Sequence, residues 1–163
     1  MSVLQSVKDI EELTLTVTAE FDAGIERVWL LWTDPRRLER WWGPPTWPAS
    51  FERHEPVEGG RSAYVMTGPD GEQARGWWRV TRVEEPTRFE FEDGFADERG
   101  DPVDALGITR ATVTLDEIEP GRTRMVLSSR FESVEQLEQM VQMGMEEGLR
   151  QAMGQIDAIL LED

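Results

Sequence analysis

The sequence lacks cysteine altogether, and its 163 residues include one histidine and one tyrosine. The absence of cysteine excludes disulfide bonds, thiol nucleophiles and thiolate metal sites, and it is typical of proteins in a reducing compartment. With His54 as the single histidine, a zinc site would need carboxylates or a second chain. A Ser-His-Asp triad would depend on this one residue, and the sequence has no Gly-x-Ser-x-Gly motif. The composition therefore argues against thiol, zinc and serine-hydrolase chemistry.

Long apolar runs and clustered basic residues are also missing. No stretch approaches the roughly 18 uninterrupted apolar residues of a membrane-spanning helix, and the N-terminus lacks the basic region and apolar run of a secretory signal. Acidic residues outnumber basic ones by 33 to 17, which gives a formal charge of −16. Such a charge opposes binding to nucleic acid or to an anionic membrane. We expect a soluble, cytoplasmic protein that binds neither, in which the acidity serves solubility rather than forming an acidic interaction face.

The length predicts a single domain. A chain of about 150 residues buries roughly 70% of its unfolded surface, so a core can form without a disulfide or a structural metal. The sequence contains no internal repeat and no interdomain linker. We expect residues 1–10 to be a loosely held N-terminal lead-in with room for one helical turn, and residues 11–163 to form the domain.

The first third of the chain contains a strand followed by two short helices. Apolar residues alternate with threonine over residues 13–19, which predicts a strand with one buried face. Apolar residues at three- and four-residue spacing predict a helix over 22–32. Asp34 as N-cap and Pro35 at the first helical position begin a second short helix that runs to about residue 40. Six further strands are predicted at about 47–51, 61–67, 74–83, 87–92, 109–118 and 123–131, with a long exposed loop over 94–107.

The C-terminal segment has the pattern of a long amphipathic helix. Ser133 and Gln136 have the spacing of a capping box, and the helix is predicted to run to about residue 160. Met140 and Met143 fall opposite its apolar stripe, where they would either form an adaptable contact surface or pack under the loop 94–107. The sequence therefore predicts an α+β fold of order β-α-α-β6-α, in which a curved antiparallel sheet wraps around this helix. The predicted stripe comprises Val134, Val141, Met145, Leu149, Ala152, Ile156 and Ile159.

Several short motifs carry a resemblance to a known family. The most specific are Trp-Trp-Gly-Pro at 41–44 and the Gly-Gly hairpin at 59–60. In their order along the chain, over roughly residues 12–160, the motifs resemble the AHSA1-like proteins, which are single-domain relatives of the activator of the Hsp90 ATPase. That group belongs to the START-like (SRPBCC) superfamily with the Bet v 1-type helix-grip fold. The other motifs are Val28-Trp29, Thr33-Asp34-Pro35, Asp70-Gly71, Pro86-Thr87-Arg88-Phe89 and Gly121-Arg122-Thr123-Arg124.

The resemblance implies a ligand-sized cavity between the helix and the sheet. It does not imply one activity, because the superfamily includes lipid carriers, polyketide aromatases, ligand receptors and co-chaperone domains. Many relatives have Gly-Trp in the final helix where this chain has Gly148 and Leu149. This departure is expected to change the shape of the cavity and to leave the fold intact.

The tryptophans and their aromatic neighbours provide candidate cavity residues. Trp77 and Trp78 are adjacent on a predicted strand, so they must face opposite ways. If Trp78 faces the cavity, it forms the cavity floor together with other aromatic and methionine side chains, and two residues of the last helix form the cavity roof. The alternative is a packed core without a ligand. Trp41 and Trp42 are expected to wedge the second helix against the sheet. The predicted ligand-binding residues are Tyr64, Met66, Trp78, Phe89, Phe91, Met145 and Leu149.

We predict no catalytic residue, no metal ligand and no cofactor. His54 shares the strand parity of Ser50 and Glu52, so it should face solvent unless a bulge intervenes. Catalytic carboxylate pairs require an apolar cleft that separates their pKa values. The adjacent carboxylates Glu11-Glu12, Glu84-Glu85 and Glu146-Glu147 are expected at the surface instead.

Three classes of function remain open. The leading hypothesis is binding of a small apolar or aromatic molecule in the cavity without catalysis, which predicts a closed apolar cavity. The resemblance also suggests a co-chaperone-like partner of an Hsp90-type ATPase, although the additional N-terminal domain of the eukaryotic activators is missing; that role predicts a collapsed interior and a large exposed patch. The third is a cyclase- or hydrolase-like enzyme, with Tyr64 as first candidate, which predicts a buried ionisable group in the cavity. A monomer or a homodimer paired through an edge strand is expected.

Overall fold

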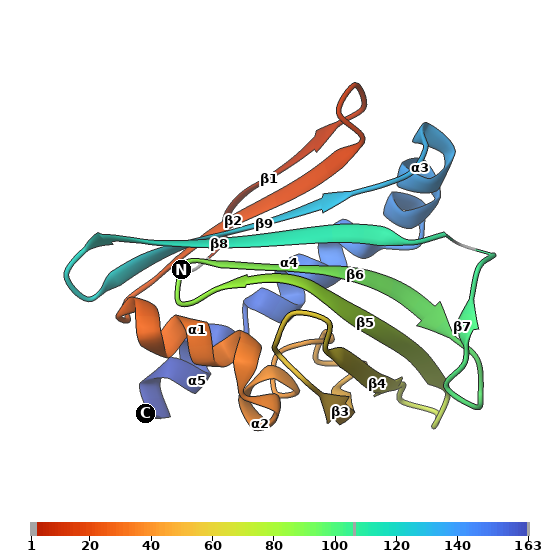
Figure 1. Ribbon diagram of the computed structural model, residues 1–163, viewed down its shortest axis with the longest axis horizontal. Helices are drawn as coiled ribbons and strands as arrows, with labels where there is room; N and C mark the ends of the chain where they lie inside the picture. Colours follow the sequence, from red (N-terminus) through yellow and green to blue (C-terminus); the bar gives the residue numbers. More distant parts are fainter. Residues whose placement is uncertain (1–2, 106, 163) are drawn as a thin grey trace.

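Among residues 3–105 and 107–162, which the computed structural model describes, nine strands form one curved antiparallel sheet (Figure 1). Strands β1 and β3 lie at its two edges, and the short strand β7 pairs with β6 outside the main order. The α+β helix-grip fold predicted from the sequence is confirmed. In spatial order the strands are β1 (Val3–Asp9), β2 (Thr14–Phe21), β9 (Arg122–Arg130), β8 (Thr109–Glu119), β6 (Arg88–Ala96), β5 (Gln73–Glu84), β4 (Arg61–Thr67) and β3 (Ala49–His54), with β7 at Pro102–Val103.

Two groups of helices pack on the sheet (Figure 1). Helices α1 (Ile25–Thr33) and α2 (Pro35–Leu38) connect β2 to β3. The predicted cap of α2 is confirmed, because the Asp34 side chain accepts a hydrogen bond from the backbone N–H of Arg36 at 3.0 Å and Pro35 follows it. The C-terminal segment contains α3 (Val134–Gln142), α4 (Met145–Met153) and α5 (Ile156–Glu162). None of the helices in the described part of the chain is long and apolar enough to cross a membrane.

The prediction of one continuous C-terminal helix is wrong, because Gly144 interrupts it. Gly144 adopts a φ of +91°, a left-handed conformation that only glycine adopts at little cost. The break changes the direction in which the residues of α3 face, so the apolar stripe predicted for one straight helix does not hold in α3. Leu137 and Met140 are buried there, whereas the predicted Val134 and Val141 are only partly buried.

The N-terminus and the loop after β6 are more ordered than expected. Residues 3–9 form β1, which pairs with β2 over most of its length, where a lead-in or a helical turn was predicted. Strand β6 continues to Ala96 and pairs with β7, so the predicted loop 94–107 is shorter. Residues 1, 2, 106 and 163 of these predicted segments lie outside the described residues. The division into a lead-in at 1–10 and a domain at 11–163 stays a prediction.

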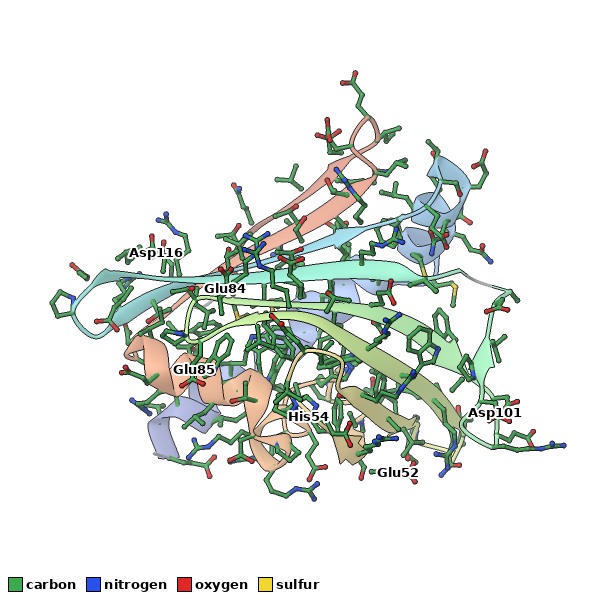
Figure 2. The ribbon with its side chains drawn as sticks, in the orientation of Figure 1. Glu52, His54, Glu84, Glu85, Asp101 and Asp116 are labelled. Atoms are coloured by element: carbon green, nitrogen blue, oxygen red, sulfur yellow. The ribbon has the colours of Figure 1, made fainter. Side chains whose placement is uncertain are left out.

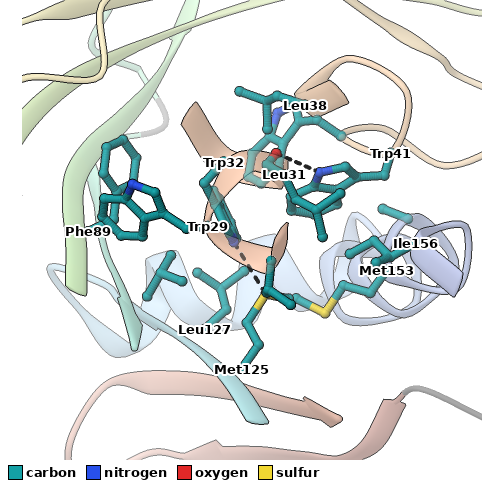
Figure 3. Close-up of a cluster of buried hydrophobic side chains, with 14 of the residues drawn as sticks. Trp29, Leu31, Trp32, Leu38, Trp41, Phe89, Met125, Leu127, Met153 and Ile156 are labelled. Atoms are coloured by element: carbon teal, nitrogen blue, oxygen red, sulfur yellow. Dashed lines mark hydrogen bonds between the residues drawn. The ribbon is translucent and has the colours of Figure 1, made fainter. Parts of the chain in front are cut away.

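The core is centred on the indole ring of Trp32 in α1, which is fully buried (Figure 3). Its N–H donates to the sulfur of Met125 at 3.2 Å, and the N–H of Trp41 donates to the carbonyl of Leu31 at 2.9 Å. The first contact joins α1 to β9, and the second joins the chain after α2 to α1. The predicted wedge of Trp41 and Trp42 between the second helix and the sheet stays a prediction. The rings within 6.3 Å of Trp32 are those of Trp41, Trp42, Trp78, Phe89 and Phe91.

Candidate ligand-binding cavity

A cavity of about 470 Å³ lies between the C-terminal helices and the concave face of the sheet. Its floor comes from β4, β5, β6, β8 and β9, and its roof from α3, α4 and the residues that join them. The segment between α2 and β3 closes one side with two indole rings. Most of the wall is apolar: Trp42, Pro44, Trp47, Tyr64, Met66, Ala74, Phe91, Phe95, Ala111, Leu127, Met140, Met143, Met145, Leu149 and Ala152 line it, together with Asp93, Thr109, Ser129 and four glycines.

Five of the seven predicted ligand-binding residues line this cavity, namely Tyr64, Met66, Phe91, Met145 and Leu149. Trp78 and Phe89 do not, and both are completely buried in the core. Helix α1 covers that half of the sheet, since Trp29 meets Phe89 edge-on at 6.0 Å and Trp32 lies 6.2 Å from Trp78. That the five lining residues bind a ligand stays a prediction.

The roof is built from the residues around the helix break. Met140 is buried with Leu15, Phe131 and Leu137, and Met143 lines the cavity while keeping much of its surface exposed. Their predicted position opposite the apolar stripe is therefore wrong, because Gly144 changes the helical phase. Gly148 leaves open space, since a Cβ built there would meet no atom within 4 Å.

Tyr64 reaches across the sheet because its neighbour on β5 is a glycine. Tyr64 is paired with Gly76, where a Cβ would come within 2.3 Å of the phenol ring. The ring therefore lies over the β5 backbone, and its hydroxyl donates a hydrogen bond to Oδ1 of Asp93 on β6 at 3.1 Å. Any side chain larger than hydrogen at position 76 would displace this ring.

Asp93 is a half-buried carboxyl group that our sequence interpretation missed. It shares the strand parity of Phe89 and Phe91, which point inward, so its side chain also lines the cavity. Burial raises its pKa to about 7, although the hydrogen bond from Tyr64 and the nearby indole N–H of Trp78 favour the ionised form. Burial and the nearby carboxyl group raise the pKa of Tyr64 well above its usual value. Near neutral pH, Tyr64 is thus a hydrogen-bond donor and Asp93 exchanges a proton.

Two indole N–H groups beside this pair have no partner of normal hydrogen-bond geometry among the described residues. They are Nε1 of Trp42 and Nε1 of Trp78, and both atoms are buried. Both lie close enough to the Tyr64 hydroxyl to lower its pKa. Trp42 lines the cavity, whereas Trp78 is buried in the core and does not line it. Both N–H groups are thus enclosed by protein atoms, and the polar groups of this part of the cavity wall are those of Tyr64 and Asp93.

His54 does not face solvent as predicted, because a β-bulge intervenes. The register between β3 and β4 shifts between Phe51 and Arg53, which turns His54 inward while Glu52 stays exposed (Figure 2). Its Nε2–H donates to the carbonyl of Trp32 at 2.8 Å, and its Nδ1 lies 2.7 Å from the Ser62 hydroxyl. Burial lowers the pKa of His54, so its contribution to stability is present above pH about 6.5 and is lost as the pH falls through the folded-state pKa. The histidine is a structural link outside the cavity.

The adjacent carboxylates lie at or near the surface. Glu11, Glu12, Glu84, Glu85 and Glu147 are exposed. Glu146 is partly buried and accepts a hydrogen bond from the Ser6 hydroxyl of β1. Within residues 3–105 and 107–162, no group of three or more His, Cys, Asp or Glu side chains is placed to hold a metal ion.

Comparison with known proteins places this geometry in a family. The family model described as activator of Hsp90 ATPase homolog 1-like protein matches residues 22–161. A solution NMR structure of a protein from Arthrobacter aurescens shares 59% identity with a TM-score of 0.94, and the match covers 99% of this chain and 94% of that one. The crystal structure of protein Ms6760 from Mycobacterium smegmatis shares 45% identity with a TM-score of 0.89, covering 97% and 96% of the two chains.

A more distant relative shares the fold. The crystal structure of the AHSA1 protein from Silicibacter pomeroyi is 21% identical with a TM-score of 0.75, and the match covers 92% of this chain and 99% of that one. No curated protein matches the chain.

Proposed function

Since the chain belongs to the family of activator of Hsp90 ATPase homolog 1-like proteins, we propose that it binds a small, largely apolar or aromatic molecule in the cavity beneath α4. The volume of about 470 Å³ carries this proposal. It falls within the roughly 300–1,000 Å³ of pockets that enclose small organic ligands. The wall supports an apolar ligand, because carbon and sulfur atoms of aromatic, aliphatic and methionine side chains form most of it.

A co-chaperone role receives less support from the same features. That role predicts a collapsed interior, whereas the interior here contains a ligand-sized cavity. It also predicts a large exposed apolar patch. The large apolar side chains that are exposed come from separate elements, such as Val7 of β1, Leu30 of α1, Ile118 of β8 and Leu161 of α5. Apolar residues exposed singly are ordinary for a protein surface.

A cyclase- or hydrolase-like activity is the second candidate, and Asp93 is the observation that favours it. A carboxyl group with a pKa of about 7 in an apolar cavity can give or take a proton at neutral pH. Asp93 would then be the acid–base group, with Tyr64 as its hydrogen-bonding partner. If the bound molecule is a substrate, Asp93→Asn should abolish its turnover while its binding persists.

Native mass spectrometry of freshly purified protein tests the binding proposal directly. We expect an adduct that denaturation releases as a small organic molecule of low polarity, and its mass identifies the chemical class. A protein that carries no adduct, and whose melting temperature does not rise with a library of apolar aromatic compounds, would contradict the proposal.

Filling the cavity from its roof should abolish binding. Leu149→Trp replaces an aliphatic side chain of the cavity wall with a bulkier indole ring, at the position where many relatives have tryptophan. We expect the affinity for apolar ligands to fall at least about tenfold. Leu161→Trp makes the same chemical change at a side chain that is 87% exposed and should leave affinity unchanged. Calorimetric titration of both variants measures the difference, and equal affinities would place the ligand elsewhere.

A further inference from the structure

In the described part of the chain, one carboxyl group is the only group lining the cavity that carries a charge when it ionises near neutral pH. Asp93 lines the cavity from β6, and no lysine, arginine or histidine of the described residues lines it. Asp93 is half-buried, so a ligand in the cavity can reach its side chain. The Tyr64 hydroxyl donates to Oδ1 and occupies one of about four lone-pair positions of the carboxylate. The polar end of the cavity, formed by Tyr64 and Asp93, therefore retains capacity to accept hydrogen bonds from a ligand.

The polar side chains at this end favour a ligand that donates hydrogen bonds. The proton of Tyr64 is directed to Asp93, which leaves the phenol oxygen as an acceptor. Thr109 is paired directly with Asp93 across β6 and β8 and also lines the cavity, and such pairs have Cβ atoms about 4.5–5.5 Å apart. A ligand carbonyl group would find only neutral hydroxyl donors here. An N–H donor finds an ionised acceptor, which forms the stronger kind of hydrogen bond.

Charge separates the ligands that can donate. A carboxylate ligand would lose its hydration without meeting a cation, and it would face Asp93. A protonated amine also loses hydration, but the carboxylate of Asp93 compensates this loss with an ion pair and a hydrogen bond. An alcohol forms the hydrogen bond without the ion pair. The net charge of −16 attracts cations at long range as well, so charge favours an amine over an alcohol and disfavours an anion.

Aromatic rings near Asp93 provide a second attraction for a cation. The ring of Trp42 lies 6.2 Å from that of Tyr64 and 6.4 Å from that of Phe91, and all three residues line the cavity. The face of an aromatic ring attracts an ammonium group that lies within about 6 Å of its centre. A carboxylate beside such rings suits an amine whose remaining part is apolar.

We propose that the cavity binds an organic amine whose protonated amino group pairs with the Asp93 carboxylate and whose hydrocarbon body lies against the apolar wall. This inference rests on the proposed function, because it names the ligand class of the same cavity. The body of the ligand contacts wall residues such as Met66 and Leu149. Because the cation stabilises the ionised carboxylate, an Asp93 that is protonated in the free protein releases its proton to solvent when the amine binds.

Four naphthalene compounds that differ in one substituent test the inference: 2-methylnaphthalene, 2-naphthalenemethanol, 2-naphthylmethylamine and 2-naphthoate. At pH 8 we expect the amine to bind about tenfold more tightly than the alcohol, which has the same shape, and 2-naphthoate to bind least. Asp93→Asn removes the charge and keeps an acceptor, so it should reduce the preference for the amine to about threefold or less. Its unfolding transition shows whether the variant is folded. Asp70→Asn makes the same chemical change in an exposed turn and should keep the full preference.

The pH dependence of binding identifies the partner of the amino group. Burial raises the pKa of Asp93 to about 7. Tyr64 of β4 is the other titratable residue of the described lining, to which β5, β8, β9, α3 and α4 contribute none, and its pKa is raised well above its usual value. The affinity for the amine should therefore rise by up to about tenfold per pH unit below pH 7 and level off above it. Asp93→Asn should abolish this rise.

The same titrations distinguish failure of this inference from failure of cavity binding. Equal affinity for the amine and the alcohol, or a preference for the amine that survives in Asp93→Asn, would overturn the amine inference. Binding of 2-methylnaphthalene in that case would leave the cavity as a site for apolar molecules. If none of the four compounds binds, the inference fails together with aromatic binding in this cavity.

Discussion

Replacing Asp93 with asparagine should raise the free energy of unfolding by roughly 2–4 kcal/mol at pH 8 and change it little at pH 4. Burial raises the pKa of Asp93 from 3.8 to about 7. A carboxyl group with a raised pKa contributes full stability below its unfolded-state pKa, and that contribution is lost as the pH rises through the folded-state value. Asparagine keeps an oxygen that can accept from Tyr64 and never ionises, so the variant escapes this loss.

Chemical denaturation of both proteins at several pH values between 4 and 8 measures this effect. The difference between the proteins should grow by up to about 1.4 kcal/mol per pH unit across the interval between the two pKa values. Asp70→Asn is the matched control, because Asp70 is exposed in the β4–β5 turn. A gain in stability that is the same at pH 4 and pH 8 would show that ionisation of Asp93 is not its cause.

Truncating Trp32 to alanine should lower the free energy of unfolding by about 3–5 kcal/mol, a large share of the stability of an ordinary domain. The ring is fully buried, touches five other aromatic rings and donates to Met125, so its removal leaves a cavity where three elements meet (Figure 3). Trp77→Ala removes the same ring from a partly buried position and should cost less than half as much. Urea denaturation compares the two variants, and equal costs would refute the central role of Trp32.

Much of the fold is predictable from local sequence patterns. The alternation over β2 predicts its buried face, since Leu15, Val17, Ala19 and Phe21 are the buried residues of this strand. Capping chemistry is equally local: Ser133 caps α3 by accepting from the backbone N–H of Gln136 at 3.1 Å. Such features depend on a few neighbouring residues, so a single sequence contains them.

Features that depend on backbone irregularity were not predictable in the same way. The bulge in β3 inverts the parity of His54, and the left-handed Gly144 changes the phase of the last helix. Each requires knowledge of the partner strand or of the packing of the sheet, because one residue more or less in register exchanges the two faces. The sequence interpretation allowed for a bulge before His54 and had no means to locate it.

The polar end of the cavity illustrates a signal that was present and passed over. Asp93 follows Phe89 and Phe91 in strict alternation, so the same parity that directs the two rings inward directs the carboxyl group inward as well. The unpaired indole of Trp42 is different, because it depends on where the chain after α2 meets β4, which no local pattern reveals.

The cavity should also make the protein responsive to hydrostatic pressure. Unfolding eliminates internal voids and so decreases the volume of the system, by an amount that grows with the void volume. The cavity of about 470 Å³ is partly open to solvent, so only the part of it that stays free of water counts as void and favours unfolding under pressure. A ligand or a tryptophan at position 149 that occupies this space should raise the pressure at which half of the molecules unfold. Pressure-dependent NMR of the free and occupied protein would thus measure how completely the cavity is filled.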